Sequence, residues 1–166
     1  MDTRNEFGEL FRAYKSKRGI ELGVGGGHFS YILNKSYDDW EEFYAVDRWA
    51  GDRGHDIIEY NNAYNLLSKF LKCKVLRVSF DEALKLFPNN YFDFIYIDGY
   101  AHTGQEQGGT LKKWFPKLKK EGIFAGHDYH SDWPLTIKYV DEFCENLNIK
   151  PYLTKNDKYP SWYFIN

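Results

Sequence analysis

The sequence predicts an α/β fold in which a doubly wound, mostly parallel sheet is covered by helices on both faces. Two observations lead to this prediction. Short apolar runs alternate with longer amphipathic stretches along the chain, and a glycine-rich turn directly follows the first apolar run. Strands that are buried on both faces read as short continuous apolar runs, so the alternation is typical of a parallel sheet. We expect one domain over residues 1–166, because this length and a hydrophobic content of 43% suit a single core.

Five short, mostly apolar runs are the candidate strands of this sheet. They cover residues 20–22, 43–46, 74–78, 94–97 and 123–125. The last part of the chain changes character and consists of two aromatic-rich runs around the polar turn Lys-Asn-Asp. This tail predicts an antiparallel hairpin at the edge of the sheet, where Pro160 is tolerated and where Trp162, Tyr163 and Phe164 enter the core.

Three further stretches have the spacing of helices. Residues 56–71 carry apolar side chains with a helical period. The second stretch has its apolar face at Leu111, Trp114, Phe115 and Leu118. Pro116 should kink or end this helix, because proline has no backbone N–H. The third helix begins near Pro134, which suits a first turn, with Ser131 or Asp132 as the cap.

Composition excludes several classes of protein. The formal net charge is −2 without a long run of either sign, so no nucleic-acid partner is expected. The basic cluster at residues 112–120 is interpreted as a solvated helix face. No apolar run suits a membrane span or a signal peptide, so we expect a cytoplasmic protein without a membrane partner. Cys73 and Cys144 lack metal-binding spacing and are expected to be buried thiols in a reducing compartment.

The stretch GIELGVGGGHFS, residues 19–30, lies where the first strand leads into the first helix. Glycines at such a turn permit positive φ and let a ligand approach the backbone, and the helix start offers unpaired N–H groups. The dinucleotide spacing G-x-G-x-x-G does not fit in either frame. What fits is E-x-G-x-G-x-G, with Glu21, Gly23, Gly25 and Gly27. This corner of the fold therefore predicts a phosphate or nucleoside site.

Asp47 ends the second strand in the run FYAVDRW and follows Gly27 by 20 residues. A carboxylate at this place can bind both hydroxyls of a ribose. The polar segment that follows, residues 48–56, is interpreted as a mobile lid over the ribose corner. The alternative is that the glycines only make a tight turn and that Asp47 caps a loop.

Four segments carry a resemblance to the class I S-adenosylmethionine-dependent methyltransferases: IELGVGGGHFS, FYAVDRW, DEALKLFPNNYFDFIYIDG and KLKKEGIFAGHDYH. The chain looks most like a small single-domain group in which the fourth strand ends in IDG plus a histidine and the fifth ends in GxDY. This resemblance implies a Rossmann-like, three-layer fold with a seven-stranded sheet in the order 3-2-1-4-5-7-6. The tail hairpin would then supply the antiparallel seventh strand.

The resemblance also assigns a site for S-adenosylmethionine. The residues that would line its methionine end are Glu21, Gly23, Gly25 and Gly27. Asp47 would hold the ribose, and Asp98 would touch the cofactor from the end of the fourth strand. Ser79 and Phe80 would flank the adenine. Relatives usually have an aspartate where Ser79 stands, so Asp81 is the alternative partner of the adenine amine.

Methyl transfer from a sulfonium is an in-line displacement, so the protein must align the acceptor atom and often remove its proton. In the metal-dependent oxygen methyltransferases of this superfamily, carboxylates after the fourth and fifth strands hold magnesium. By this resemblance Asp98, His127 and Asp128 are candidate ligands of Mg²⁺ or another divalent metal, although imidazole favours softer metals. The alternative is that His127 and Asp128 only hydrogen-bond locally. Asp98 and Asp128 are also candidate catalytic residues, with His102 as the general base.

The sequence therefore predicts an S-adenosylmethionine-dependent methyltransferase that acts on a small-molecule acceptor, at oxygen. An NPPY-type tetrapeptide, which would suggest methylation of bases or protein amides, is replaced by IDGY. The length leaves little room for an acceptor domain, so loops at the strand ends would build the pocket and a second subunit of a homodimer would close it. Two alternatives stay open: an enzyme that uses the same cofactor for lyase-like chemistry, and a cofactor-binding accessory subunit without turnover.

Overall fold

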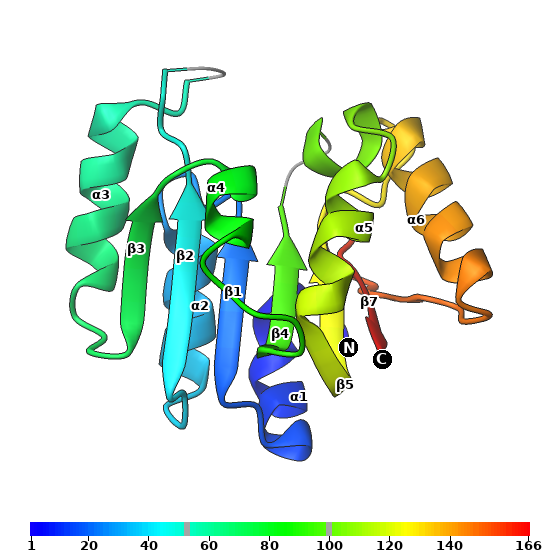
Figure 1. Ribbon diagram of the computed structural model, residues 1–166, viewed down its shortest axis with the longest axis horizontal. Coiled ribbons are helices and arrows are strands. Elements are labelled where there is room, and N and C mark those ends of the chain that lie inside the picture. Colours follow the sequence, from blue (N-terminus) through cyan, green and yellow to red (C-terminus); the bar gives the residue numbers. More distant parts are fainter. Residues whose placement is uncertain (52–53, 99–100) are drawn as a thin grey trace.

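The computed structural model describes residues 1–51, 54–98 and 101–166, and of Ala101 and His102 the backbone alone. Seven strands form one sheet in the order β3-β2-β1-β4-β5-β7-β6, and β7 runs antiparallel to both of its neighbours (Figure 1). The strands are β1 (Arg18–Leu22), β2 (Glu42–Asp47), β3 (Cys73–Arg77), β4 (Phe92–Ile97), β5 (Leu118–Gly126), β6 (Tyr152–Leu153) and β7 (Trp162–Ile165). The structure confirms the strand order, the antiparallel seventh strand and the tail hairpin that the sequence predicts.

Parallel pairing aligns the carboxyl ends of the central strands. Leu22 at the end of β1 is paired with Val46 of β2 and with Ile97 of β4. Ile97 is paired in turn with Gly126 at the end of β5. The residues that directly follow these strands therefore meet at one edge of the sheet, and in open α/β sheets this carboxyl edge is where ligands bind.

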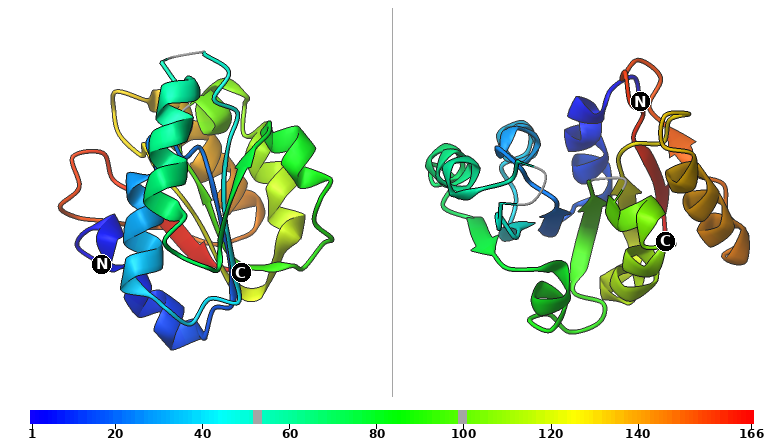
Figure 2. Two further views of the ribbon diagram at one scale, coloured as in Figure 1. Left: turned by 90° about the vertical axis from the view of Figure 1, so that its left-hand side faces the viewer. Right: turned by 90° about the horizontal axis from the view of Figure 1, so that it is seen from above.

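Helices cover both faces of the sheet (Figures 1 and 2). On one face lie α1 (Phe7–Tyr14), α2 (His28–Ser36) and α3 (Ile57–Leu67). On the other face lie α4 (Phe80–Leu84), α5 (Gly109–Trp114) and α6 (Pro134–Asn146). Short 3-10 turns form at Arg4–Glu6 and Phe115–Lys117, and a π-helical turn forms at Ala101–Gln105.

Each face of the sheet has its own apolar core. On the α1 side, Phe7 and Phe11 are fully buried and pack against Phe94 of β4. Their spacing of four residues places both rings on one side of a helix, which is a local sequence signal for α1. On the other side, Trp114 of α5 and Val140 of α6 are fully buried in the second cluster.

Two predicted helices end earlier than their apolar pattern indicates. α3 ends at Leu67 rather than at residue 71, and Leu71 is 95% exposed. α5 ends at Trp114 and gives way to a 3-10 turn that contains Pro116, which cannot donate a backbone hydrogen bond. Leu118, expected on the helix, instead begins β5 and is paired with Phe92 of β4. Strand pairing therefore overrides the helical spacing at this position.

The basic cluster at residues 112–120 consequently does not form a single helix face, because it spans the end of α5, the 3-10 turn and the start of β5. Lys113 is paired with Asp81 and Lys119 with Asp93, each at 2.7 Å. These pairs support the interpretation of the cluster as ordinary solvated surface.

The start of α6 differs from its prediction in one respect. Pro134 occupies the first turn as expected, but the N-cap position is Trp133, which makes no side-chain capping hydrogen bond. The prediction that Ser131 or Asp132 caps this helix is therefore wrong.

Two further findings concern the length of the helices and the state of the cysteines. None of the helices in the described ranges is long and apolar enough to cross a membrane. Both cysteines are free thiols, with Cys144 buried as predicted and Cys73 only half-buried.

Candidate active site

The glycine-rich turn between β1 and α2 is shaped by close backbone packing. Gly23 has a φ of +94°, and a Cβ there would lie 2.4 Å from the carbonyl oxygen of Asp98. Gly27 has a φ of +85°, and a Cβ there would lie 3.0 Å from the Cα of Ala63 in α3. Both positions therefore require glycine. At Gly25 the nearest atom to an added Cβ belongs to His55 and is 3.5 Å away, so this position is less crowded than Gly23 and Gly27.

Asp47, at the end of β2, is bound to this turn. One carboxylate oxygen accepts hydrogen bonds from the N–H groups of Val24 and Gly25, each at 3.0 Å. The other oxygen accepts from the N–H of Arg48 at 2.6 Å and from that of Trp49 at 3.3 Å. These four backbone donors attach both carboxylate oxygens to the neighbouring backbone. Asp47 thus lies at the predicted ribose corner and also fixes the shape of the turn.

The start of the predicted lid, residues 48–56, is attached to the same turn. Trp49 is 1% exposed, and its indole N–H donates to the carbonyl oxygen of Gly25 at 2.9 Å. Asp52 and Arg53 lie outside the described residues, so the structure leaves the middle of the predicted lid untested.

Glu21 lies in β1, just before the glycine-rich turn, and is 1% exposed. The hydroxyl of Ser30 on α2 donates a hydrogen bond to its carboxyl group. Burial, and after it the charge of Asp98, raises the pKa of Glu21 to about 8, and the hydrogen bond from Ser30 offsets this only in part. Glu21 is therefore largely protonated at neutral pH and would ionise if a cation bound beside it.

Asp98, His127 and Asp128 meet where β4 and β5 end. Nδ1 of His127 lies 3.4 Å from a carboxylate oxygen of Asp98 and 3.0 Å from one of Asp128. One potential donor atom from each residue lies within 4.8 Å of the other two. We call this group the strand-end cluster. The structure thus brings together three residues that the sequence proposes as metal ligands.

Arg4 joins the strand-end cluster from the 3-10 turn that precedes α1. Its guanidinium Nη1 donates to the second carboxylate oxygen of Asp98 at 3.0 Å. No motif or spacing in the sequence marks Arg4, which lies 94 positions from Asp98. Sequence reasoning therefore missed it, and local patterns carry no signal that could have found it.

Neighbouring charges decide the pKa values within the cluster. Burial alone would lower the pKa of His127, but hydrogen bonds to Asp128 and Asp98 outweigh burial and raise it to about 9. Burial alone would raise the pKa of Asp98, but His127 and Arg4 together hold it below its ordinary value. At neutral pH the carboxylate of Asp98 therefore faces two cations, a guanidinium and an imidazolium.

This arrangement does not fit a divalent metal. Nδ1 of His127, one of the potential ligand atoms, already lies within 3.4 Å of carboxylate oxygens of Asp98 and Asp128. The guanidinium of Arg4 also occupies an oxygen of Asp98 with a permanent positive charge, which repels a second cation. The cluster therefore has the oxygen and nitrogen atoms that could bind a metal, but it lacks the net negative charge that would attract a divalent cation.

Ser79 and Phe80, expected beside the adenine, begin α4. The Ser79 hydroxyl accepts from the backbone N–H of Glu82 at 3.3 Å, and the Glu82 carboxylate accepts from the backbone N–H of Ser79 at 2.9 Å. Phe80 is half-buried against the core. Asp81, the alternative partner of the adenine amine, is paired with Lys113. The side chain of Ser79 is therefore engaged in capping the helix.

His102, the predicted general base, belongs to the π-helical turn Ala101–Gln105 that follows β4. Its side chain lies outside the described residues, so its direction stays a prediction. His130, interpreted as a surface histidine, accepts a hydrogen bond from the backbone N–H of Asp132 at 3.2 Å and packs against the ring of Tyr159.

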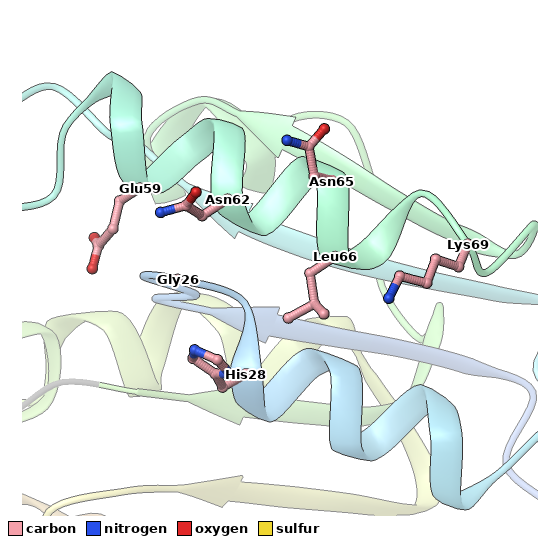
Figure 3. Close-up of a pocket in the computed structure, with 7 residues that line it drawn as sticks. All are labelled: Gly26, His28, Glu59, Asn62, Asn65, Leu66 and Lys69. Atoms are coloured by element: carbon pink, nitrogen blue, oxygen red, sulfur yellow. The ribbon is translucent and has the colours of Figure 1, made fainter.

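A cavity of about 580 Å³ opens between α2 and α3 beside the glycine-rich turn (Figure 3). It is lined by Gly26, His28, Glu59, Asn62, Asn65, Leu66 and Lys69. His28 begins α2. Glu59 is paired with His55 at 2.5 Å, a partner that the sequence analysis did not identify although the two residues are four positions apart. The cavity borders the turn but does not include the strand-end cluster.

Comparisons with known proteins agree with this geometry. A family model for a methyltransferase domain matches residues 20–129, which include the glycine-rich turn and the strand-end cluster. No curated protein matches the sequence.

Solved structures share the fold at low sequence identity. A proposed caffeoyl-CoA O-methyltransferase from Staphylococcus aureus aligns with a TM-score of 0.74 at 15% identity, over 96% of this chain and 81% of that one. The SAH-bound methyltransferase PaMTH1 from Podospora anserina aligns with a TM-score of 0.71 at 15% identity, over 96% and 76%. The O-methyltransferase NovP aligns with a TM-score of 0.70 at 19% identity, over 98% and 77%.

Proposed function

Because this chain belongs to the methyltransferase-domain family, we propose that it transfers the methyl group of S-adenosylmethionine to a hydroxyl oxygen of a small-molecule acceptor. The proposal rests on one observation. The glycine-rich turn packs against Asp98 at the carboxyl edge of the sheet, where Asp98 also lies beside His127 and Asp128. Oxygen as the acceptor is supported by two of the similar structures, which are described as O-methyltransferases.

The cofactor would lie across the carboxyl ends of β1 and β2. Gly25 would lie beside the cofactor, since a Cβ there would have no neighbour closer than 3.5 Å. Glu21 would lie near the methionine end, where an ammonium group would favour the carboxylate form of Glu21. Asp47 would hold the ribose while it keeps the turn in shape. Ser79 and Phe80 would flank the adenine from the start of α4.

S-adenosylmethionine supplies a methyl group on a positively charged sulfur, which leaves as a neutral thioether. The acceptor oxygen attacks the methyl carbon in line with the breaking C–S bond, so the protein must align this oxygen and accept its proton. Asp98 and Asp128 would orient the acceptor hydroxyl, and His102 would take the proton.

The acceptor pocket would be built from the loops at the carboxyl edge. A second copy of the chain would close this pocket in a homodimer. Analytical ultracentrifugation of the purified protein tests the assembly, and a monomer that still turns over its acceptor would contradict this part of the proposal.

Calorimetric titration tests the cofactor half of the proposal. Wild-type protein should bind S-adenosylmethionine and S-adenosylhomocysteine, and Asp47→Ala should weaken both by at least about tenfold, since several charge-assisted hydrogen bonds are lost. Asp39→Ala is the matched control, because Asp39 is exposed and paired with Lys17 away from the carboxyl edge. No binding of either ligand by the wild type would overturn the proposal.

Product analysis tests the transfer half. Incubation with S-adenosylmethionine and a panel of hydroxylated small molecules should yield a methyl ether together with S-adenosylhomocysteine. Release of methylthioadenosine would instead favour the lyase-like alternative. Cofactor binding without any product across the panel would favour the accessory-subunit alternative.

A further inference from the structure

Arg4 has a defined place beside the strand-end cluster. Besides its bond to Asp98, its Nη1 donates to the hydroxyl of Tyr96 at 3.4 Å, and that hydroxyl is hydrogen-bonded to Ser161 at 2.7 Å. The guanidinium carbon lies 4.4 Å from the centre of the Phe29 ring, a distance typical of a cation–π contact. Only 27% of the Arg4 side chain is exposed. Such contacts distinguish Arg4 from an arginine in an ordinary surface ion pair.

The polar turn between β6 and β7 holds the segment that carries Arg4 (Figure 2). The backbone N–H groups of Lys155 and Asn156 both donate to the carbonyl oxygen of Asp2, at 3.0 and 2.8 Å. The backbone N–H of Arg4 donates to the carboxylate of Asp157 at 2.8 Å. This is the Lys-Asn-Asp turn that the sequence marks as the bend of the tail hairpin, and it has the second role of fixing Arg4 against the cluster.

We propose that Arg4 is a built-in cation of this site and keeps divalent metals out of the strand-end cluster. The inference rests on the proposed function only in regarding this cluster as the acceptor site. Its physical basis is that a guanidinium stays protonated in proteins. A divalent ion among the three donor groups would lie near this permanent charge in a half-buried place, where charges interact more strongly than in water. The acceptor oxygen therefore meets a guanidinium where related active sites are expected to hold a metal.

Removal of Arg4 would leave donors that a metal can use. Atoms of Asp98, His127 and Asp128 already lie within 4.8 Å of one another. Two carboxylates and one imidazole suit Zn²⁺ or Mn²⁺. The substitution Arg4→Gln keeps a polar side chain and removes the charge, so it should turn the cluster into a metal site.

The experiment is calorimetric titration of the whole chain with Zn²⁺ and with Mn²⁺, each alone and without cofactor. Arg4→Gln should bind at least one of these ions at least about tenfold more tightly than the wild type does. The gain should disappear when Asp98→Asn is added. Arg4→Lys keeps the charge and should exclude the ions as the wild type does. Arg12→Gln is the matched control, because it removes an exposed arginine whose guanidinium donates to the carbonyl oxygen of Ser36.

Equal metal affinity of the wild type and Arg4→Gln would overturn the inference, whether both bind or neither binds. If circular dichroism shows that Arg4→Gln does not fold, Asp157→Ala gives a second route, since it removes the side-chain acceptor of the Arg4 backbone N–H without touching the cluster. Unchanged metal affinity in folded Asp157→Ala would then overturn the inference. Because no titration contains S-adenosylmethionine, failure of the proposed function would be seen separately, as absent cofactor binding.

Discussion

Asp47 and Gly25 are joined by a hydrogen bond of 3.0 Å from the backbone N–H of the glycine to the carboxylate of the aspartate. Val24 donates to the same oxygen, so the end of β2 holds the glycine-rich turn. In Asp47→Asn one oxygen becomes an NH₂ group that faces backbone donors. We expect the free energy of unfolding to fall by about 2 kcal/mol, because hydrogen bonds to charged groups contribute about 1.5–3 kcal/mol each. Urea unfolding measures the change.

Asp39→Asn is the control for this prediction. Asp39 is exposed and paired with Lys17, and surface ion pairs contribute little to stability. Its free energy of unfolding should therefore stay close to that of the wild type. A loss at Asp47 no larger than the loss at Asp39 would contradict the role of Asp47 in holding the turn.

Gly23→Ala and Gly51→Ala separate backbone strain from packing. The two glycines have nearly the same φ, +94° and +90°, so alanine should be strained at both, by about 1–3 kcal/mol. An added Cβ at Gly23 would lie 2.4 Å from the carbonyl oxygen of Asp98, whereas at Gly51 no atom of the described residues beyond its chain neighbours lies within 4 Å of one. Gly23→Ala should therefore cost about 1–3 kcal/mol more, as overpacking does. If urea unfolding gave equal losses of free energy for the two variants, the close approach of β1 to β4 at Gly23 and Asp98 would not be needed for stability.

Glu21→Gln should change how stability depends on pH. The pKa of Glu21 is raised to about 8 by burial, so the folded state keeps a proton that the unfolded chain releases near its ordinary pKa of 4.5. The contribution of this carboxyl group to stability is complete below the unfolded pKa and is lost as the pH rises through about 8. Relative to the wild type, Glu21→Gln should gain stability from about pH 5 to about pH 8. Chemical unfolding across this range measures the difference, and parallel curves would contradict the prediction.

His102→Gln and His127→Gln identify the base of the proposed reaction. If His102 takes the acceptor proton, its loss should lower kcat by about 10²–10⁴-fold at saturating cofactor. His127 already forms hydrogen bonds with two carboxylates, so its loss should disturb the acceptor site more through KM than through kcat. Steady-state kinetics of both variants make the comparison. If only His127→Gln lost a large part of kcat, His127 rather than His102 would be the base that takes the acceptor proton.

The α/β fold class could be predicted because buried strands depend on short stretches of sequence, whereas the order of the seven strands and the candidate ligands came from the resemblance to the methyltransferases. Buried strands are visible as apolar runs, and parallel strands end at the same edge of the sheet. Asp98, His127 and Asp128 directly follow two of these runs, so their meeting follows from the strand pairing. The pairing of His55 with Glu59 could also have been predicted, because residues four positions apart lie side by side at the start of a helix.

Contacts between distant segments could not be predicted in this way. Leu118 has helical spacing with Trp114, yet its pairing with Phe92 places it in a strand. Arg4 is set against Asp98 by residues near the other end of the chain, which no local pattern connects with it. Arg4 is therefore a charged neighbour of the strand-end cluster that local sequence patterns do not reveal.

The attachment of the first residues to the tail hairpin has a consequence for biosynthesis. Asp157 is made 153 residues after Arg4, so a nascent chain can build β1 to β5 before the N-terminal segment has its anchor. Closing so long a loop costs entropy before its contacts form, which places this step late in refolding as well. Until then the three donor groups would lack their guanidinium and would be open to metal ions in the surrounding solution. The tail hairpin thus completes the surroundings of the strand-end cluster as well as the sheet.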